Sequence, residues 1–183
     1  MKNPVATIET SHGAIVIELY PEKAPNTTRS FIWMAQRGLY DNRLIRRIVP
    51  GFVIQPSYSC FEDERCNVSL DGEYALNGFD NTVPFQKGTV AMGGVDKVAS
   101  GSCFFITLSD EAAKTLDGRF AAFGQVISGW DEVERLEKVR THSVDIGMEG
   151  VTVNEPVEPE LMRRVTVETW GTDYPPPEIL PET

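Results

Sequence analysis

The most conspicuous chemical feature of this sequence is an arginine pair inside an apolar stretch. Arg46 and Arg47 are flanked by Ile45 and Ile48, and the stretch runs on to Gln55. Because consecutive side chains of a strand point to opposite faces, one of the two arginines must share a face with apolar neighbours. A guanidinium stays charged and offers several N–H donors in a fixed plane, so it could bind a polar group of a substrate. The ordinary role of a strand arginine is a surface residue or an ion-pair partner, and the residues alone leave that alternative open.

Other kinds of chemistry find little support. His12 and His142 have no ligand partner at metal spacing, so we expect no metal site. Cys60 and Cys66 lie in a polar segment without a nearby histidine, which makes a metal or redox role improbable for them. The sequence contains no nucleophile elbow, phosphate-binding glycine loop or dinucleotide fingerprint, and no carboxylate pair stands out.

Composition restricts the class of protein. The 17 basic and 27 acidic residues give a formal net charge of −10, which argues against a general nucleic-acid binder. Three cysteines are too few for a disulfide-framed secreted domain. No run approaches the roughly 20 apolar residues of a membrane span, and the first residues lack the apolar stretch of a signal peptide. We therefore expect a cytoplasmic protein with reduced thiols, without a membrane partner.

Short apolar runs separated by glycine and polar turns follow one another along the chain. They are typical of a barrel or sandwich. We expect strands at residues 5–10, 13–20, 45–49, 52–55, 89–92, 103–108 and 121–127 and a closing strand around 165–167. Two helices are predicted, one beginning near Pro25 and stopping near Gly38, the other over residues 130–139.

Three segments fall outside this pattern. Residues 57–72 are predicted to be a loop, and residues 141–160 an acidic surface connection. Four prolines in residues 172–183 indicate a polyproline-like or disordered tail. The expected organisation is a barrel domain over residues 1–171 followed by this tail.

Several ordered motifs carry a family resemblance. The run RRIVPGFVIQ, residues 46–55, resembles the cyclophilin signature. Residues 24–27, 38–41, 88–92, 101–106, 116–119 and 123–126 are similar to further family blocks in the family's order. The similarity extends over about residues 5–170, so the chain resembles a cyclophilin-type peptidyl-prolyl cis-trans isomerase along nearly its whole length.

This resemblance implies a mainly β fold, a closed eight-stranded antiparallel barrel capped by two α-helices. The catalytic arginine, carried over by motif, is Arg47. The implied substrate-binding residues are Phe52, Val53, Gln55, Gly93, Gly94, Cys103, Phe105, Leu116 and Phe120. Neither a metal nor another cofactor is expected.

The implied activity is rotation about Xaa-Pro bonds in proline-containing peptides and unfolded protein chains, which assists protein folding. We expect the protein to act as a monomer. One alternative is a binding module on the same fold that holds proline-containing segments with little turnover. A weaker hypothesis is that residues 174–177 of the tail dock into the protein's own groove.

The sequence departs from the family pattern at several groove positions. Arg46 replaces a histidine, Val53 a methionine and Phe120 a histidine. The two side-chain amides that usually bind the peptide are missing, because their positions hold Gly94 and Cys103. We expect a weaker grip on the substrate backbone, a changed substrate preference and retained isomerase activity, since Arg47 is kept.

Overall fold

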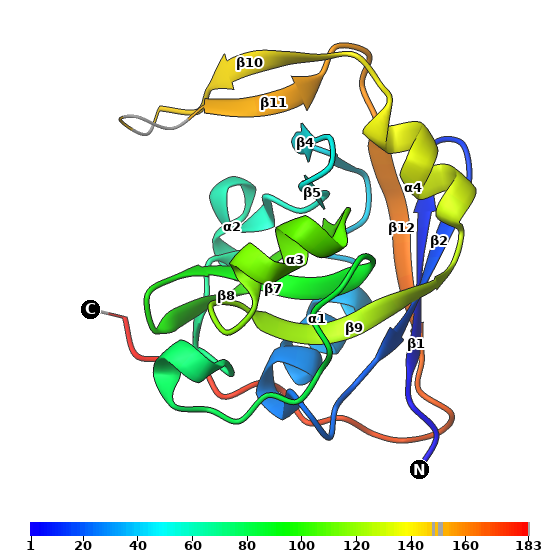
Figure 1. The fold of residues 1–183 in the computed structure, drawn as a ribbon. Coiled ribbons are helices and arrows are strands. Elements are labelled where there is room, and N and C mark those ends of the chain that lie inside the picture. The colour runs from blue at the N-terminus through cyan, green and yellow to red at the C-terminus, as the bar shows by residue number, and fades with distance from the viewer. Residues whose placement is uncertain (148, 150–151, 183) are drawn as a thin grey trace.

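The protein is built on one strongly curled antiparallel sheet with helices at its two ends (Figure 1). The computed structural model describes residues 1–147, 149 and 152–182. The strands are β1 Val5–Thr10, β2 Ala14–Leu19, β3 Arg43–Leu44, β4 Arg47–Val49, β5 Val53–Gln55, β6 Ser69–Asp71, β7 Thr89–Val95, β8 Val98–Thr107, β9 Ala121–Ser128, β10 Thr141–Asp145, β11 Thr152–Pro156 and β12 Leu161–Glu168. The helices are α1 Pro25–Gln36, α2 Ser59–Glu62, α3 Asp110–Leu116 and α4 Trp130–Glu137, with 3-10 turns η1 Glu64–Cys66 and η2 Ala75–Asn77.

The sheet runs in the order β3-β12-β1-β2-β9-β7-β8-β5-β4, and β6 pairs with β8. The closing strand is confirmed, since β12 pairs with β1 from Val5↔Glu168 onward. Ten strands form this sheet where eight were expected, because the short strands β3 and β6 were not predicted. Only Ile45 and Arg46 separate β3 from β4, so the chain itself connects the two ends of the hydrogen-bonded path.

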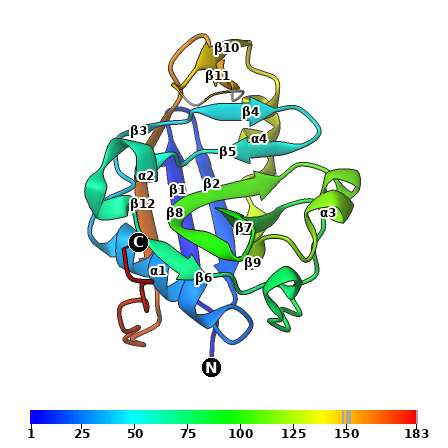
Figure 2. The same cartoon turned by 90° about the vertical axis from the view of Figure 1, so that its left-hand side faces the viewer.

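The two predicted helices are confirmed and lie at opposite ends of the curled sheet, as Figures 1 and 2 both show. Pro25 occupies the first turn of α1. The free N–H groups of Asn26 and Thr27 donate to the carboxylate of Glu73, a residue distant in sequence, at 3.3 and 2.6 Å. Gly38, with φ +67°, ends the helix as predicted, because a left-handed residue is cheapest as glycine.

Four aromatic side chains form a cluster inside the barrel, within a core that is otherwise mainly aliphatic. Phe31 from α1 packs against Tyr40, Phe104 and Phe123, with ring centroids 5.2–5.4 Å apart, and all four residues are fully buried. The hydroxyl of Tyr40 donates to the Ser102 carbonyl oxygen at 2.9 Å. This cluster fixes α1 against β8 and β9.

The two predicted irregular segments are more ordered than expected. The loop prediction for residues 57–72 is wrong, because the segment contains α2, η1 and β6. The prediction of an extended connection at 141–160 is also wrong, because β10 and β11 form a separate hairpin that projects from the barrel (Figure 1). Its strands rest on no large core, so they show little of the apolar alternation that marks a barrel strand.

The tail follows the surface in a defined path. Tyr174 packs against the barrel core. The Asn26 side chain and the Glu178 backbone exchange two hydrogen bonds of 2.9 and 2.8 Å, and the Leu180 N–H donates to the Ser69 carbonyl oxygen at 2.8 Å. The tail therefore lies along the start of α1 and the edge of β6.

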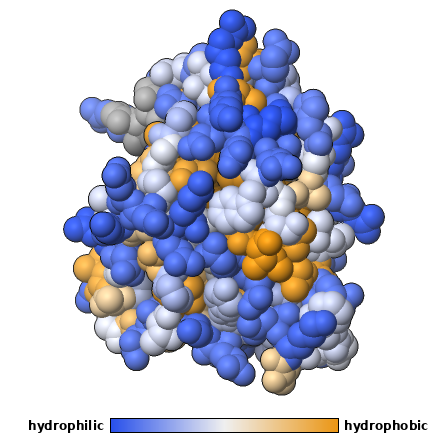
Figure 3. Space-filling model, turned by 45° about the vertical axis from the view of Figure 1, so that its right-hand side comes forward, coloured by the Kyte–Doolittle hydropathy of each residue, from blue (hydrophilic) through white to orange (hydrophobic). Residues whose placement is uncertain are grey.

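Polar residues dominate the face drawn in Figure 3, and hydrophobic residues form only small groups on it. This agrees with the acidic composition. In the described ranges, no helix has the length and hydropathy that crossing a bilayer requires.

Candidate active site

The register of β4 and β5 places Arg47 on the outer face of the barrel. Arg47 pairs with Gln55, and Val49 pairs with Val53, so these four side chains share one face. Ile48 and Ile54 point the other way and are fully buried in the core. Because consecutive side chains of a strand alternate, the three residues of β4 contribute to both faces, Ile48 to the core face and Arg47 and Val49 to the site face.

The site face continues across the neighbouring strands as a second apolar cluster, here called the outer cluster. Its buried members are Val53, Val83, Ala91, Phe105, Leu116 and Ala122, with Tyr20, Phe52, Phe85 and Phe120 partly buried around them. Ladder pairs connect Phe105 to Ala91 and Ala91 to Ala122, so β8, β7 and β9 all contribute. Helix α3 adds Leu116 from outside the sheet.

Five of the residues predicted to line a proline pocket meet in the outer cluster. They are Phe52, Val53, Phe105, Leu116 and Phe120. Phe105 lies deep and is 5% exposed. Phe120 packs edge-on against it, with centroids 5.4 Å apart and an interplanar angle of 89°. The result is a shallow apolar surface with two half-buried phenylalanines at its rim.

Arg47 is half-buried beside this surface. Its Nη1 donates to Oε1 of Gln55 at 3.4 Å, and its Cζ lies 5.9 Å from the centroid of the Phe52 ring. No carboxylate in the described part of the chain lies within 4.0 Å of its guanidinium. Burial raises the pKa of Tyr58, and the nearby charge of Arg47 opposes this rise. The guanidinium therefore lies between Gln55 and Phe52.

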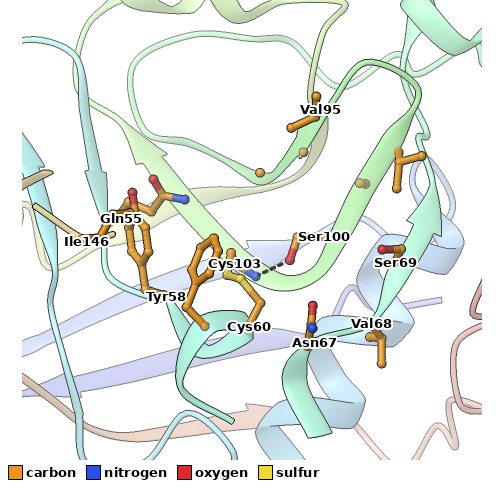
Figure 4. Close-up of a pocket in the computed structure, with 15 residues that line it drawn as sticks. Gln55, Tyr58, Cys60, Asn67, Val68, Ser69, Val95, Ser100, Cys103 and Ile146 are labelled. Atoms are coloured by element: carbon orange, nitrogen blue, oxygen red, sulfur yellow. Dashed lines mark hydrogen bonds between the residues drawn. A yellow bond between two sulfur atoms is a disulfide. The ribbon is translucent and has the colours of Figure 1, made fainter. Parts of the chain in front are cut away.

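The other four predicted residues line a groove next to the outer cluster. We call it the side groove, a depression of about 580 Å³ (Figure 4). Gln55, Gly93, Gly94 and Cys103 belong to its lining. Gln55 contacts Arg47 on one side and borders the side groove on the other, so it joins the two parts of the site.

Close packing restricts Gly93 and requires a glycine at position 94. A Cβ added to Gly93 would lie 3.0 Å from the Cys103 carbonyl oxygen and 3.4 Å from Nε2 of Gln55. A Cβ on Gly94 would lie 2.5 Å from the Val98 carbonyl oxygen, inside the tight β7–β8 hairpin. The hairpin geometry therefore excludes the asparagine that the family pattern has at this position.

Cys103 carries a bond that the sequence reading missed. It forms a disulfide with Cys60 of α2, and Cys66 is buried as a free thiol. The expectation that all three thiols are reduced is therefore wrong for this structure. The two partners are 43 residues apart, and only the fold brings them together.

Arg46 does not take part in the outer cluster. Its Nε donates to Glu62 of α2 at 2.8 Å and its Nη1 to Glu155 of β11 at 3.3 Å. It ties both elements to the barrel, the ion-pair role that the sequence left open for one of the two arginines. Tyr58, Phe61 and Ile146 also line the side groove and were not predicted, since they come from the two segments misread as irregular.

Comparison with known proteins identifies the family of the chain. A family model described as cyclophilin type peptidyl-prolyl cis-trans isomerase/CLD matches residues 5–167. The peptidyl-prolyl cis-trans isomerase CYP18-2 of Arabidopsis thaliana is 33% identical, over 78% of this chain and 85% of that protein. Peptidyl-prolyl cis-trans isomerase-like 1 of Aspergillus niger is 34% identical, over 79% and 88%.

Solved structures give the same fold. A cyclophilin type peptidyl-prolyl cis-trans isomerase of Cryptosporidium parvum superposes with a TM-score of 0.73 at 20% identity, covering 91% of this chain and 98% of that one. A second structure of that protein, determined in the presence of the dipeptide Ala-Pro, gives a TM-score of 0.72. With the fold, the motifs and the relatives in agreement, this chain belongs to the cyclophilin-type peptidyl-prolyl cis-trans isomerase family.

Proposed function

We propose that this chain accelerates rotation about Xaa-Pro bonds with Arg47 as the catalytic residue and the outer cluster as the seat of the proline ring. The observation that carries the proposal is the position of the guanidinium. It is charged, hydrogen-bonded to the neutral amide of Gln55, and adjacent to Phe52 at the rim of the apolar surface.

The reaction needs only a suitably placed donor. The amide C–N bond has partial double-bond character, and rotation about it meets a barrier of ~18–20 kcal/mol. In the twisted transition state the conjugation is lost, and the proline nitrogen carries a localised lone pair. An N–H of Arg47 directed at that nitrogen stabilises the twisted state more than either planar state, which is the differential binding that catalysis requires.

The remaining residues would hold the substrate during rotation. A proline ring placed over Phe105, between Phe52 and Phe120, is kept from turning by apolar contact. Gln55 both orients Arg47 and offers a polar contact to the peptide backbone. Gly93 and Gly94 let the backbone approach β7 closely. Phe120 and Val53, where the family pattern has histidine and methionine, give the seat a different shape and therefore a different preference.

The natural substrates under this proposal are proline-containing segments of peptides and of unfolded protein chains. Support comes from the half-buried apolar rim of Phe52 and Phe120 beside Arg47, which suits a segment lying across the surface better than an enclosed small molecule. A cytoplasmic location and a monomeric state stay predictions from composition.

A protease-coupled assay on a short Xaa-Pro peptide tests the proposal. We expect Arg47→Ala to lower kcat/KM by about 10²–10³-fold, the usual effect of losing one preorganised donor. The matched control is Arg164→Ala, which removes an exposed strand arginine on β12 that belongs to neither the outer cluster nor the side groove. Equal activity of the two variants would reject Arg47. A folded wild type that binds the peptide without accelerating its isomerisation would favour the binding-module alternative.

A further inference from the structure

The side groove has an uncharged lining. None of its 15 lining residues is acidic or basic, although the chain as a whole is strongly acidic. Apolar side chains surround it, among them Phe61, Val95 and Val98, which are 62%, 76% and 41% exposed. Apolar residues left this exposed around an uncharged depression favour binding of an apolar group.

One wall of the side groove is a very short element. Phe61 lies on α2 and Tyr58 directly precedes it, with ring centroids 5.6 Å apart and ring planes tilted by 30°. A helix of four residues cannot be stable alone, because nucleating a helix costs more than one turn returns. The position of this aromatic wall therefore depends on what attaches α2 to the barrel.

The Cys60–Cys103 disulfide is the covalent attachment. Cys103 lies in β8, is 4% exposed, and its N–H donates to the Ser100 hydroxyl at 3.0 Å. Cys60 lies between Tyr58 and Phe61 in sequence and is half-buried. Their Cα atoms are 6.3 Å apart, which is within the range of natural disulfides. Figure 4 shows the bridge between the wall and the floor of the side groove.

The second attachment of α2 is weaker. Glu62 pairs with Arg46, whose side chain is 34% exposed, and with Arg43 at 3.5 Å. Partly exposed ion pairs of this kind contribute little to stability. Without the disulfide, the aromatic wall would rest on these ion pairs, on the Arg43–Asp63 pair and on the buried Ser59, with no covalent bond to β8.

We propose that the Cys60–Cys103 disulfide is a thiol-controlled clamp on substrate selection. When it is closed, the Tyr58–Phe61 wall shapes the side groove to bind a bulky apolar side chain near the proline. When it is open, the wall moves and that preference is lost. The inference rests on the proposed function, since it concerns substrates that reach the side groove from the outer cluster past Gln55.

The chemistry of opening is thiol–disulfide exchange with a dithiol reductant. Both cysteines line the open side groove, and the half-buried Cys60 sulfur is the more accessible of the two. One thiolate of the reductant attacks it, forming a mixed disulfide and releasing the Cys103 thiolate. The second thiol of the reductant then displaces Cys60. The reductant becomes a disulfide, and both cysteines end as thiols after the Cys103 thiolate takes up a proton.

The test compares peptides that differ only in the residues next to proline. One series carries leucine and the other serine, placed in turn at the two positions before and the two positions after the proline. We expect the leucine-to-serine ratio of kcat/KM at one position to be roughly tenfold or more in the oxidised protein, as burial of one aliphatic side chain gives. Reduction with dithiothreitol should bring the ratio near one. A ratio unaffected by reduction at every position overturns the proposal.

Three controls make the result specific. Cys60→Ser should behave like the reduced protein with or without dithiothreitol. Cys66→Ala, which removes the buried free thiol, should respond as the wild type does. Alkylation under denaturing conditions should find one reactive thiol in air-equilibrated protein and three reactive thiols after reduction. Three reactive thiols in the protein before reduction would contradict the clamp.

Direct binding separates this proposal from the proposed function. A fluorescent leucine peptide should bind the oxidised protein more tightly than the reduced protein, whether or not the protein turns it over. A glycine-flanked Ala-Pro peptide should be isomerised equally in both states. If the protein does not isomerise the peptide but its binding still depends on the redox state, the catalytic role alone is rejected. If the protein isomerises the peptide but its binding is the same in both redox states, the clamp alone is rejected.

Discussion

Phe104 and Phe105 are neighbours in β8, and the fold predicts opposite consequences for their replacement by leucine. Phe104 points into the core and makes edge-on contacts with Phe31 and Tyr40, at centroid distances of 5.2 and 5.3 Å. Phe105 points to the outer cluster and makes one such contact, with Phe120, at 5.4 Å. A change of one residue in register would exchange their roles.

The magnitudes follow from these contacts. An aromatic pair of this geometry contributes ~0.5–1.5 kcal/mol beyond the area it buries. Phe104→Leu therefore loses about 1–3 kcal/mol of unfolding free energy from its two pairs, and Phe105→Leu about half of that. Because Phe105 is expected to seat the proline ring, its loss should lower kcat/KM by roughly tenfold, equivalent to one ring contact of ~1.4 kcal/mol.

Urea unfolding gives the stability, and the protease-coupled assay at a fixed amount of folded protein gives the activity. We expect Phe104→Leu to be the less stable variant with near wild-type kcat/KM. Phe105→Leu should be the more stable of the two and the less active. A larger loss of kcat/KM in Phe104→Leu than in Phe105→Leu would refute the division into a core face and a site face.

Two further predictions concern stability. Burial alone would raise the pKa of Glu132, but hydrogen bonds from Arg135 and Thr10 outweigh it and hold the pKa below the ordinary 4.5. The carboxylate of Glu132 thus stabilises the fold above pH ~4.5, and thermal unfolding should show a loss of stability as the pH falls below this value. The loss should be less steep in Arg135→Met. An equally steep loss in that variant would contradict the stabilising role of these hydrogen bonds. Removing residues 172–183 should lower Tm, because Tyr174 packs on the core and Glu178 is hydrogen-bonded to Asn26. An unchanged Tm would show that these contacts do not stabilise the fold.

Strand periodicity accounts for most of what the sequence could predict. Alternation predicts that Arg46 and Arg47 point to opposite faces, but the register of β4 and β5 was needed to place Arg47, Val53 and Gln55 together on the site face. The position of Phe105 in the same cluster required the family resemblance, since no local pattern shows which strand lies beside β5.

The missed features depend on contacts between distant segments. The Cys60–Cys103 disulfide joins residues from α2 and β8, and three cysteines at irregular spacing do not predict a pairing. The β10–β11 hairpin was missed because Val153 is among its few buried side chains, so its strands carry no clear alternation. The contact of Glu73 with the start of α1 was missed for the same reason, because only the fold brings this distant residue to the N–H group of Thr27.

The contacts of the tail could not be predicted from its composition. Its prolines predicted a polyproline-like or disordered segment, and its described residues, 172–182, contain no helix or strand, but three hydrogen bonds and the half-buried ring of Tyr174 hold it on the surface. Those contacts involve the Asn26 side chain and the Ser69 carbonyl oxygen, and neither can be paired with the tail from sequence alone.

Exchange NMR on a proline peptide tests the central claim most directly, because it observes binding and rotation in one sample. Wild-type protein in catalytic amount should produce cis–trans exchange peaks together with binding shifts. Arg47→Ala should keep the binding shifts, since the outer cluster is intact, and lose the exchange peaks. Exchange as fast with Arg47→Ala as with the wild type would contradict the assignment of catalysis to Arg47.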